Sequence, residues 1–291
     1  MPLTALGLVI LAAVMHACWN FVLKQATHKP VFLWCGVIIG TCFFGTLCLI
    51  AGPVIGLSFS LKKAWPYMLA SAVMEVFYYL ALTRAYDIDD FSLIYPIARG
   101  TAPVLLLFWS TVFLGEWPSR TGLLGIAILV VGLVIVGSGT LWTRWRREMF
   151  SVKGIVAALV AAACISIYSV IDGAAVRVVS AIPYTVLMLG LSALLATPAI
   201  KHYYGMNGVV KEFRMNWRRI WFVGIFMLLT YILVLLAYSM ARVSYSGAIR
   251  EVSIVFAALM GWLWLGEGFG LVRTLGSFCI FAGIVVIAIF G

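Results

Sequence analysis

The sequence predicts an all-α integral membrane protein, in which ten transmembrane helices form two inverted five-helix repeats. Three observations predict this fold: the apolar composition, the length of the apolar stretches and an internal duplication. The chain has 291 residues, of which 64% are hydrophobic and only 10% are charged, whereas soluble domains carry roughly 25% charged residues. Apolar stretches of about 20 residues recur along it, which is the length a helix needs to cross a bilayer. The low charged fraction excludes a water-soluble core, and an all-helical bundle follows because unpaired backbone groups cannot face lipid.

Ten spans are predicted, five in each half. They are residues 3–24, 31–51, 65–86, 92–114, 121–140, 153–174, 183–201, 219–241, 245–265 and 271–290. An odd number of crossings per repeat forces the second copy to enter the membrane from the opposite side, which makes the repeats inverted. We therefore expect a first repeat over residues 1–140, a basic linker over 141–152 and a second repeat over 153–291. The glycine-containing segment 202–218 is expected to be the longest loop.

The duplication is visible in the sequence itself. Leu114-Gly115-Glu116 recurs 151 positions later as Leu265-Gly266-Glu267. Other residues match in the same register, namely Arg99 with Arg250, Gly125 with Gly276, and Gly132 with Gly283. Internal duplication in a membrane chain is typical of carriers built from two pseudo-symmetric halves. The two glutamates follow helix ends, so we expect them to be turn or capping residues rather than substrate ligands.

The net charge of +10 is attributed to short loops rather than to a nucleic-acid surface. The face with more basic residues carries thirteen, namely Lys24, Lys29, Arg84, Arg144, Arg146, Arg147, Lys153, Lys201, Lys211, Arg214, Arg218, Arg219 and Arg273. The opposite face carries five, namely Lys62, Lys63, Arg120, Arg177 and Arg242. The positive-inside rule then places the richer face in the cytoplasm and both termini outside. These charges are also expected to contact anionic lipid head groups.

No metal site or cofactor is predicted. The six cysteines lie inside apolar spans without a CxxC motif, and the three histidines are scattered. Asp87, Asp89 and Asp90 crowd one turn, but no further ligands stand near them in the sequence, and a hard cation needs more.

Among the ionisable residues inside the spans, four stand out: Glu75, Arg99, Arg250 and Glu251. A charge at bilayer depth costs about 2.5–3.5 kcal/mol on insertion scales, so such residues suggest function. Arg99 and Arg250 are repeat equivalents, so they should approach a common midplane cavity from opposite sides. Pro96 and Pro103 flank Arg99 and would bend its helix. The alternative is a structural ion pair between Arg99 and Glu75.

Glu75 is the preferred proton-coupling candidate, because a carboxyl in an apolar bundle can take up and release a proton as a cavity changes sides. Helical spacing places it on one face with Ser71, Tyr78 and Tyr79. In this part of the chain the register of the repeat is 152, which pairs Trp65 with Trp217 and Tyr79 with Tyr231. The position equivalent to Glu75 is then Met227, so any proton site would be asymmetric.

Two polar stripes complete the candidate site. The first is formed by His16, Trp19, Asn20 and Lys24, and the second by Ser166, Ser169 and Asp172 beside Tyr168. We interpret them as walls of a hydrated cavity, the alternative being hydrogen bonds between helices. The candidate substrate-binding residues are Arg99, Arg250, Glu251, Tyr79, Trp19, Asn20 and Tyr168.

The ten spans, the repeated Leu-Gly-Glu signature and the His16-Ala17-Cys18-Trp19-Asn20 opening followed by Lys24 resemble the drug/metabolite transporter superfamily, and within it the EamA-type carriers. The resemblance covers essentially the whole chain. It implies a secondary carrier whose central cavity is lined by the first, third, fourth, sixth, eighth and ninth spans. Such carriers move amino acids, small metabolites or organic cations, commonly as exporters and often by proton exchange. Ten-span relatives usually keep both termini in the cytoplasm, whereas the charge count here favours the reverse.

The expected function is alternating-access transport of a small polar metabolite, either amino-acid-like or an organic anion, across the plasma membrane (the inner membrane of a bacterium). Arginine suits an anion because its guanidinium binds carboxylate or phosphate in bidentate fashion. Two alternatives remain: an organic-cation or drug efflux carrier, which would use Glu75 and aromatic residues, and a non-transporting subunit of a membrane assembly. An intramembrane enzyme is not expected, because no nucleophile, base or metal cluster has a suitable spacing. The oligomeric state is left open.

Overall fold

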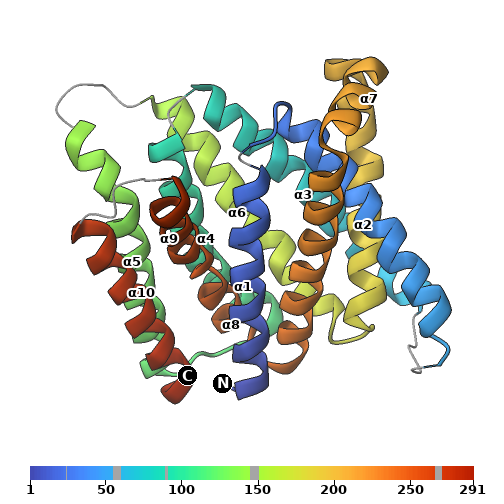
Figure 1. The fold of residues 1–291 in the computed structure, drawn as a ribbon. Helices are drawn as coiled ribbons and strands as arrows, with labels where there is room; N and C mark the ends of the chain where they lie inside the picture. Colours follow the sequence, from blue (N-terminus) through green and yellow to red (C-terminus); the bar gives the residue numbers. More distant parts are fainter. Residues whose placement is uncertain (24, 55–59, 89–90, 145–150, 266–270) are drawn as a thin grey trace.

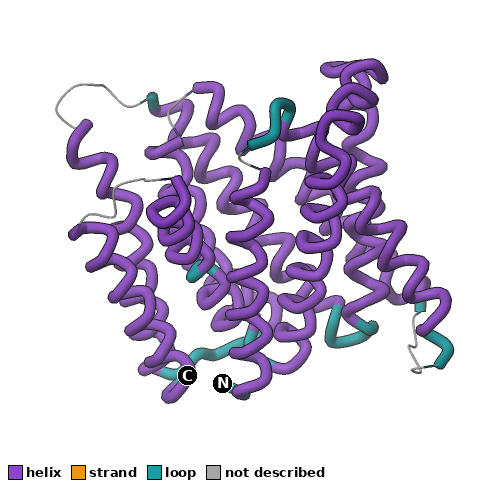
Figure 2. Tube along the Cα trace, viewed as in Figure 1, coloured by secondary structure: helices purple, strands orange, loops and turns teal. Residues whose placement is uncertain are grey.

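The computed structural model of the chain describes residues 1–23, 25–54, 60–88, 91–144, 151–265 and 271–291, and this part contains helices and turns but no strand (Figures 1 and 2). The helices are α1 (Leu3–Leu23), α2 (Lys29–Ala51), α3 (Leu61–Ile88), α4 (Phe91–Leu114), α5 (Arg120–Arg144), α6 (Val152–Ala175), α7 (Ala181–Met240), α8 (Val243–Arg250), α9 (Ser253–Leu265) and α10 (Leu271–Phe290). Both termini lie at the same face (Figure 1), where the Met1 amino group donates a hydrogen bond to the Ala288 carbonyl at 3.3 Å. The predicted all-helical fold is confirmed.

Six segments of the described chain are long and apolar enough to cross a membrane. They are Leu3–Leu23, Lys29–Ala51, Ile97–Leu114, Val152–Ala175, Ala181–Met240 and Val243–Trp264, and shorter apolar helices cover Arg120–Val136 and Thr274–Phe290. The chain is therefore a multi-pass membrane protein. The count of ten crossings stays a prediction.

Helix α7 corrects one expectation, because residues 202–218 are helical rather than a loop. A straight helix of its 60 residues would be about 90 Å long, far more than a bilayer. Backbone breaks at Gly205 (φ 63°, ψ 166°) and Asn216 (φ −125°, ψ 15°) divide it, and Figure 1 shows α7 turning back on itself at the end far from the termini. Between the breaks, Val209 and Glu212 are buried. Their burial against the bundle explains why this segment stays helical despite its glycines.

A second correction concerns the ninth predicted span, 245–265, which is two helices rather than one. Helix α8 ends at Arg250 and α9 begins at Ser253. The turn between them is closed by bonds to the third residue back, from Glu251 N–H to the Ala248 carbonyl at 3.1 Å and from Val252 N–H to the Ile249 carbonyl at 3.0 Å. Arg250 and Glu251, which are consecutive at this turn, are both buried in the interior.

The two halves of the chain interleave. The most extensive helix contacts join one half to the other: α2 packs on α7, α5 on α10 and α3 on α6. The contacts also come in pairs related by exchange of the halves, since α3 with α6 is matched by α1 with α7, and α4 with α6 by α1 with α8 and α9. Each half therefore depends on the other for its packing.

Glycines make two of these contacts close. A Cβ atom placed at Gly40 of α2 would lie 2.4 Å from the Gly224 carbonyl oxygen of α7, which shows that the Gly36-x-x-x-Gly40 pattern is used for helix packing. On α5, a Cβ at Gly132 would lie 2.7 Å from the Gly276 oxygen of α10.

The contact between α5 and α10 also shows that the two halves are related by a two-fold axis. Gly125 contacts Gly283 while Gly132 contacts Gly276, so these two helices run antiparallel (Figure 1). Gly125 and Gly276 are repeat equivalents, as are Gly132 and Gly283. Exchange of the halves therefore maps one contact onto the other, as a two-fold relation requires.

Candidate functional site

Two arginines meet at one buried carboxylate in the interior, as their equivalence in the repeats predicts. The Nη1 atom of Arg99 lies 3.2 Å from Oε1 of Glu251, and Nη2 of Arg250 lies 3.8 Å from the same oxygen. The exposed fractions of these side chains are 11% for Arg99, 9% for Arg250 and 1% for Glu251. Arg99 also donates to Nε2 of His16 at 2.9 Å. We call these four residues the arginine group.

The helices explain why these side chains converge. Arg99 projects from α4 near Pro103, Arg250 is the last residue of α8, and His16 lies on α1. Glu251 lies directly after α8, where it is the partner of Arg99. The sequence alternative paired Arg99 with Glu75; the carboxylate that bonds it is Glu251.

The arginine group has unused hydrogen-bonding capacity. Within the described chain, Arg250 Nε and Glu251 Oε2 are buried and have no hydrogen-bond partner. The hydroxyls of Ser246 and Ser253, on either side of the break, are also buried without a hydrogen-bond partner in the described chain. A buried polar group without a partner costs about 1–3 kcal/mol. A polar ligand placed here would relieve that cost.

A second group of polar residues is acidic and lies where α3, α6 and α7 meet. Asp172 of α6 is fully buried, and its two carboxylate oxygens accept hydrogen bonds from the tyrosines of α7, from Tyr184 at 2.6 Å and from Tyr231. Glu75 of α3 is 7% exposed, contacts Ser192, and interacts electrostatically with Asp172. Its Oε2 atom has no hydrogen-bond partner in the described residues. We call these four residues, Glu75, Asp172, Tyr184 and Tyr231, the acidic group.

Tyr168 links the two groups. It is 8% exposed and interacts electrostatically with Arg250 and Arg99 of one group and with Glu75 of the other. Its ring lies 6.2 Å from that of Tyr78, which in turn lies 5.1 Å from the ring of Tyr79. The candidate residues Tyr79 and Tyr168 thus belong to one aromatic wall beside both groups.

The remaining candidates on α1, Trp19 and Asn20, both lie next to His16. Trp19 packs edge-on against His16 with ring centroids 4.8 Å apart, and it is otherwise part of the hydrophobic core. The side-chain amide of Asn20 donates to the His16 carbonyl of its own helix at 2.8 Å. This bond lies within α1, so it is not the hydrogen bond between helices that the alternative predicted. Lys24 lies outside the described residues.

Sequence analysis missed several members of these groups as site residues. His16 and Asp172 were recognised only as parts of polar stripes, and Tyr184 was not singled out. Tyr231 carried a usable signal, because it is the repeat equivalent of Tyr79. For Asp172, the signal was an acidic residue within an apolar span.

The described residues contain no group of three His, Cys, Asp or Glu side chains that could hold a metal ion. Asp89 and Asp90 of the acidic turn lie outside the described residues. The six cysteines are free.

Comparison with known proteins gives one family and one fold. The sequence profile of the EamA-like transporter family matches residues 3–138 and again residues 152–289. No curated protein matches the chain. A solved structure, described only as "Crystal structure of protein", superposes with a TM-score of 0.77 at 15% sequence identity and covers 99% of each chain. At that identity the likeness shows a shared fold.

Proposed function

Because the chain belongs to the EamA-like transporter family, we propose that it is a secondary active transporter that moves a small polar metabolite by alternating access. The observation that carries this proposal is the arginine group, in which equivalent residues of the two halves meet beside a helix break. Broken helices at the interface of repeats supply polar groups to substrates in carriers. Burial of charges inside an apolar bundle is costly, and charges kept there usually mark a substrate or ion pathway.

The preferred substrate carries a carboxylate or another small anion. The open Nε–H of Arg250 and its neighbouring guanidinium nitrogens suit bidentate binding of such a group. An amino-acid-like substrate fits best, because its amine would face Glu75 and Asp172 while its carboxylate faces Arg250. Tyr168, which interacts with both groups, would then lie along the bound molecule.

An organic cation is the second candidate, and the acidic group favours it. Two buried carboxylates beside Tyr78, Tyr79 and Tyr168 can hold a cation by charge attraction and cation–π contact. A cation of this kind would not need Arg250.

Coupling to protons is assigned to Glu75, whose buried Oε2 atom is without a partner in the described chain. We propose export across the plasma membrane, the inner membrane of a bacterium, with both termini outside as the charge count indicates. Reporter fusions to each terminus would test that orientation.

The transport proposal is tested by counterflow in proteoliposomes with a panel of amino acids, organic acids, nucleosides and organic cations. Arg250→Gln should abolish uptake of the anion or zwitterion that wild type carries, while the protein stays folded. The exposed Arg219→Gln is the matched control and should transport normally. Uptake that is unchanged in Arg250→Gln but lost in Glu75→Gln would favour the cation. A protein that moves nothing and copurifies with another subunit would contradict transport altogether.

A further inference from the structure

Glu116 caps a helix of the opposite half of the chain. Its Oε1 atom accepts a hydrogen bond from Val243 N–H at 2.8 Å, and its Oε2 atom accepts from Ser244 N–H at 3.1 Å and from the Ser244 hydroxyl at 2.9 Å. The expected capping role is thus confirmed, but the capped helix is α8. The repeat equivalent, Glu267, lies outside the described residues.

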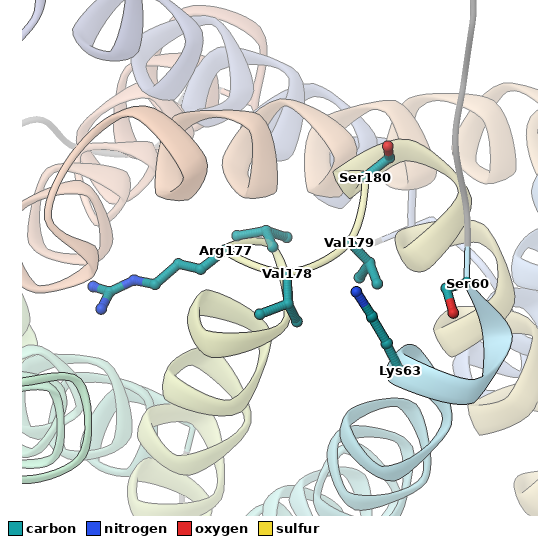
Figure 3. Close-up of a pocket in the computed structure, with 7 residues that line it drawn as sticks. Ser60, Lys63, Arg177, Val178, Val179 and Ser180 are labelled. Carbon is teal, nitrogen blue, oxygen red and sulfur yellow. The ribbon is translucent and has the colours of Figure 1, made fainter.

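Arg177 completes this contact. It donates through Nη2 to Oε1 of Glu116 at 2.9 Å and through Nη1 to the Leu114 carbonyl at 3.1 Å. Figure 3 shows its side chain pointing away from Lys63 and Ser60, which line a pocket of about 540 Å³ with it. We call Glu116, Arg177 and the first turn of α8 the clamp.

The clamp supplies hydrogen-bond acceptors to the N–H groups of the first turn of α8. The N-cap residue Arg242 makes no side-chain capping bond, so the first N–H groups of α8 depend on Glu116 for acceptors. A carboxylate is also favourable at this end of a helix because of the helix dipole. Glu116 is 5% exposed, so water does not readily replace it.

The clamp is mechanically connected to the arginine group. Helix α8 has eight residues and is about 12 Å long, with the clamp at its first turn and Arg250 at its last residue. A shift of the clamped end therefore moves Arg250 as well.

The clamp also borders an opening toward the termini face. A pocket of about 730 Å³ is lined there by Glu116, Arg177, Tyr238, Arg242 and Tyr245, among others. Tyr238 is only 2% exposed, and a Cβ atom placed at Gly247 of α8 would lie 3.2 Å from its hydroxyl. Tyr238 interacts electrostatically with Arg250 and Glu251. Tyr238 therefore lines this pocket and also lies near the arginine group.

We propose that the clamp and Tyr238 form the gate of the termini face, closed in this structure, and that release of Glu116 from α8 opens it. Glu116 is a positioning residue in this proposal, since it acts on Arg250 through α8. The inference rests on the proposed transport function, but its test does not need a known substrate.

The test measures access to the space behind Tyr238. Ser169 is fully buried and lies near Tyr238, so Ser169→Cys places a thiol there with little change in shape. A membrane-impermeant maleimide is added to either side of oriented proteoliposomes of the full chain. Modification of position 169 is followed peptide by peptide with mass spectrometry, which separates it from the native cysteines.

Adding Glu116→Gln should raise the modification rate from the termini face by about tenfold, as expected when an equilibrium loses roughly one charge-assisted hydrogen bond. The rate from the opposite face should not rise. Arg177→Gln should act in the same direction, and it keeps the proposal testable if Glu116→Gln fails to fold. Arg120→Gln, an exposed arginine of the same face, is its control.

Glu212→Gln is the matched control for Glu116→Gln. Glu212 is a buried carboxylate that accepts from His28 N–H and from the Asn216 side-chain amide, but it belongs to the segment of α7 far from the clamp. An unchanged rate in both folded clamp variants, or an equal rise in Glu212→Gln, would overturn the gate. Loss of transport in the substrate panel with the expected labelling pattern would instead count against the transport function alone.

Discussion

The two halves of this molecule are alike at their outer seam and different at their centre. In the seam of α5 and α10, equivalent glycines make equivalent contacts, Gly125 with Gly283 and Gly132 with Gly276. At the centre, Arg99 projects from the continuous α4, whereas Arg250 ends α8 at a break. Packing has therefore kept the symmetry of the duplication, while the residues suited to bind a substrate have lost it.

The largest effect is expected at the residue that joins the two arginines. Glu251→Ala leaves two buried cations without their shared partner, and breaking a buried pair costs about 3–5 kcal/mol. We expect the lowest thermal unfolding temperature of all single variants in detergent, and no transport. Glu251→Gln keeps a hydrogen-bond acceptor and should lose less. An unchanged unfolding temperature in Glu251→Ala would show that the two arginines are held by other groups.

The second comparison separates the two arginines. Arg99 bonds both Glu251 and His16, while the ion pair of Arg250 with Glu251 is longer, at 3.8 Å. Arg99→Gln should therefore destabilise the protein by about 1.5–3 kcal/mol, as lost charged hydrogen bonds do, and Arg250→Gln should cost less. Unfolding and counterflow are measured on the same preparations. Equal destabilisation by both variants would mean that the central asymmetry has no energetic consequence.

The third comparison tests the symmetric seam. Gly132→Val and Gly283→Val make the same change at repeat-equivalent positions, since a Cβ on either glycine would lie within 2.7 Å of the carbonyl oxygen of the glycine that it faces. Each should cost about 1–3 kcal/mol, the usual range for overpacking, and the two values should agree. Gly7→Val is the control, because a Cβ there meets nothing within 4 Å. A large difference between the two seam variants would argue against the two-fold relation.

The smallest change in stability is expected at Glu75, whose repeat equivalent is Met227. Glu75→Met copies the second half into the first and removes a buried carboxyl oxygen without a partner. Such replacements are often neutral, so unfolding should change by less than about 1 kcal/mol. Transport driven by an imposed pH gradient should be lost, while counterflow without a gradient persists. Met227→Leu is the control, and gradient-driven transport that survives in Glu75→Met would place the coupling group elsewhere.

Much of the fold could be predicted because hydropathy and duplication are properties of the linear sequence. Apolar length located most of the helices, and the repeat register predicted that Arg99 and Arg250 approach each other. The capping role of Glu116 was expected for the same reason, as a charged residue directly after an apolar span.

Features that depend on how helices face one another could not be predicted in this way. The alternative to a substrate contact paired Arg99 with Glu75, whereas its partner is Glu251. Glu251 lies in the turn between α8 and α9, and hydropathy does not register a single tight turn. Residues 202–218 were expected to be a loop, because their glycines hide the burial of Val209 and Glu212. The tyrosines around Asp172 come from a part of the sequence that no motif connects to it.

The interleaved packing has a consequence for how the protein is made. During synthesis the first five helices enter the membrane before the helices against which α2, α3 and α5 pack have been translated. Until the second half is inserted, the apolar surfaces of these helices, including the glycine face of α5, stay in contact with lipid or with the insertion machinery. Assembly can therefore finish only late, after α10 has been inserted beside α5.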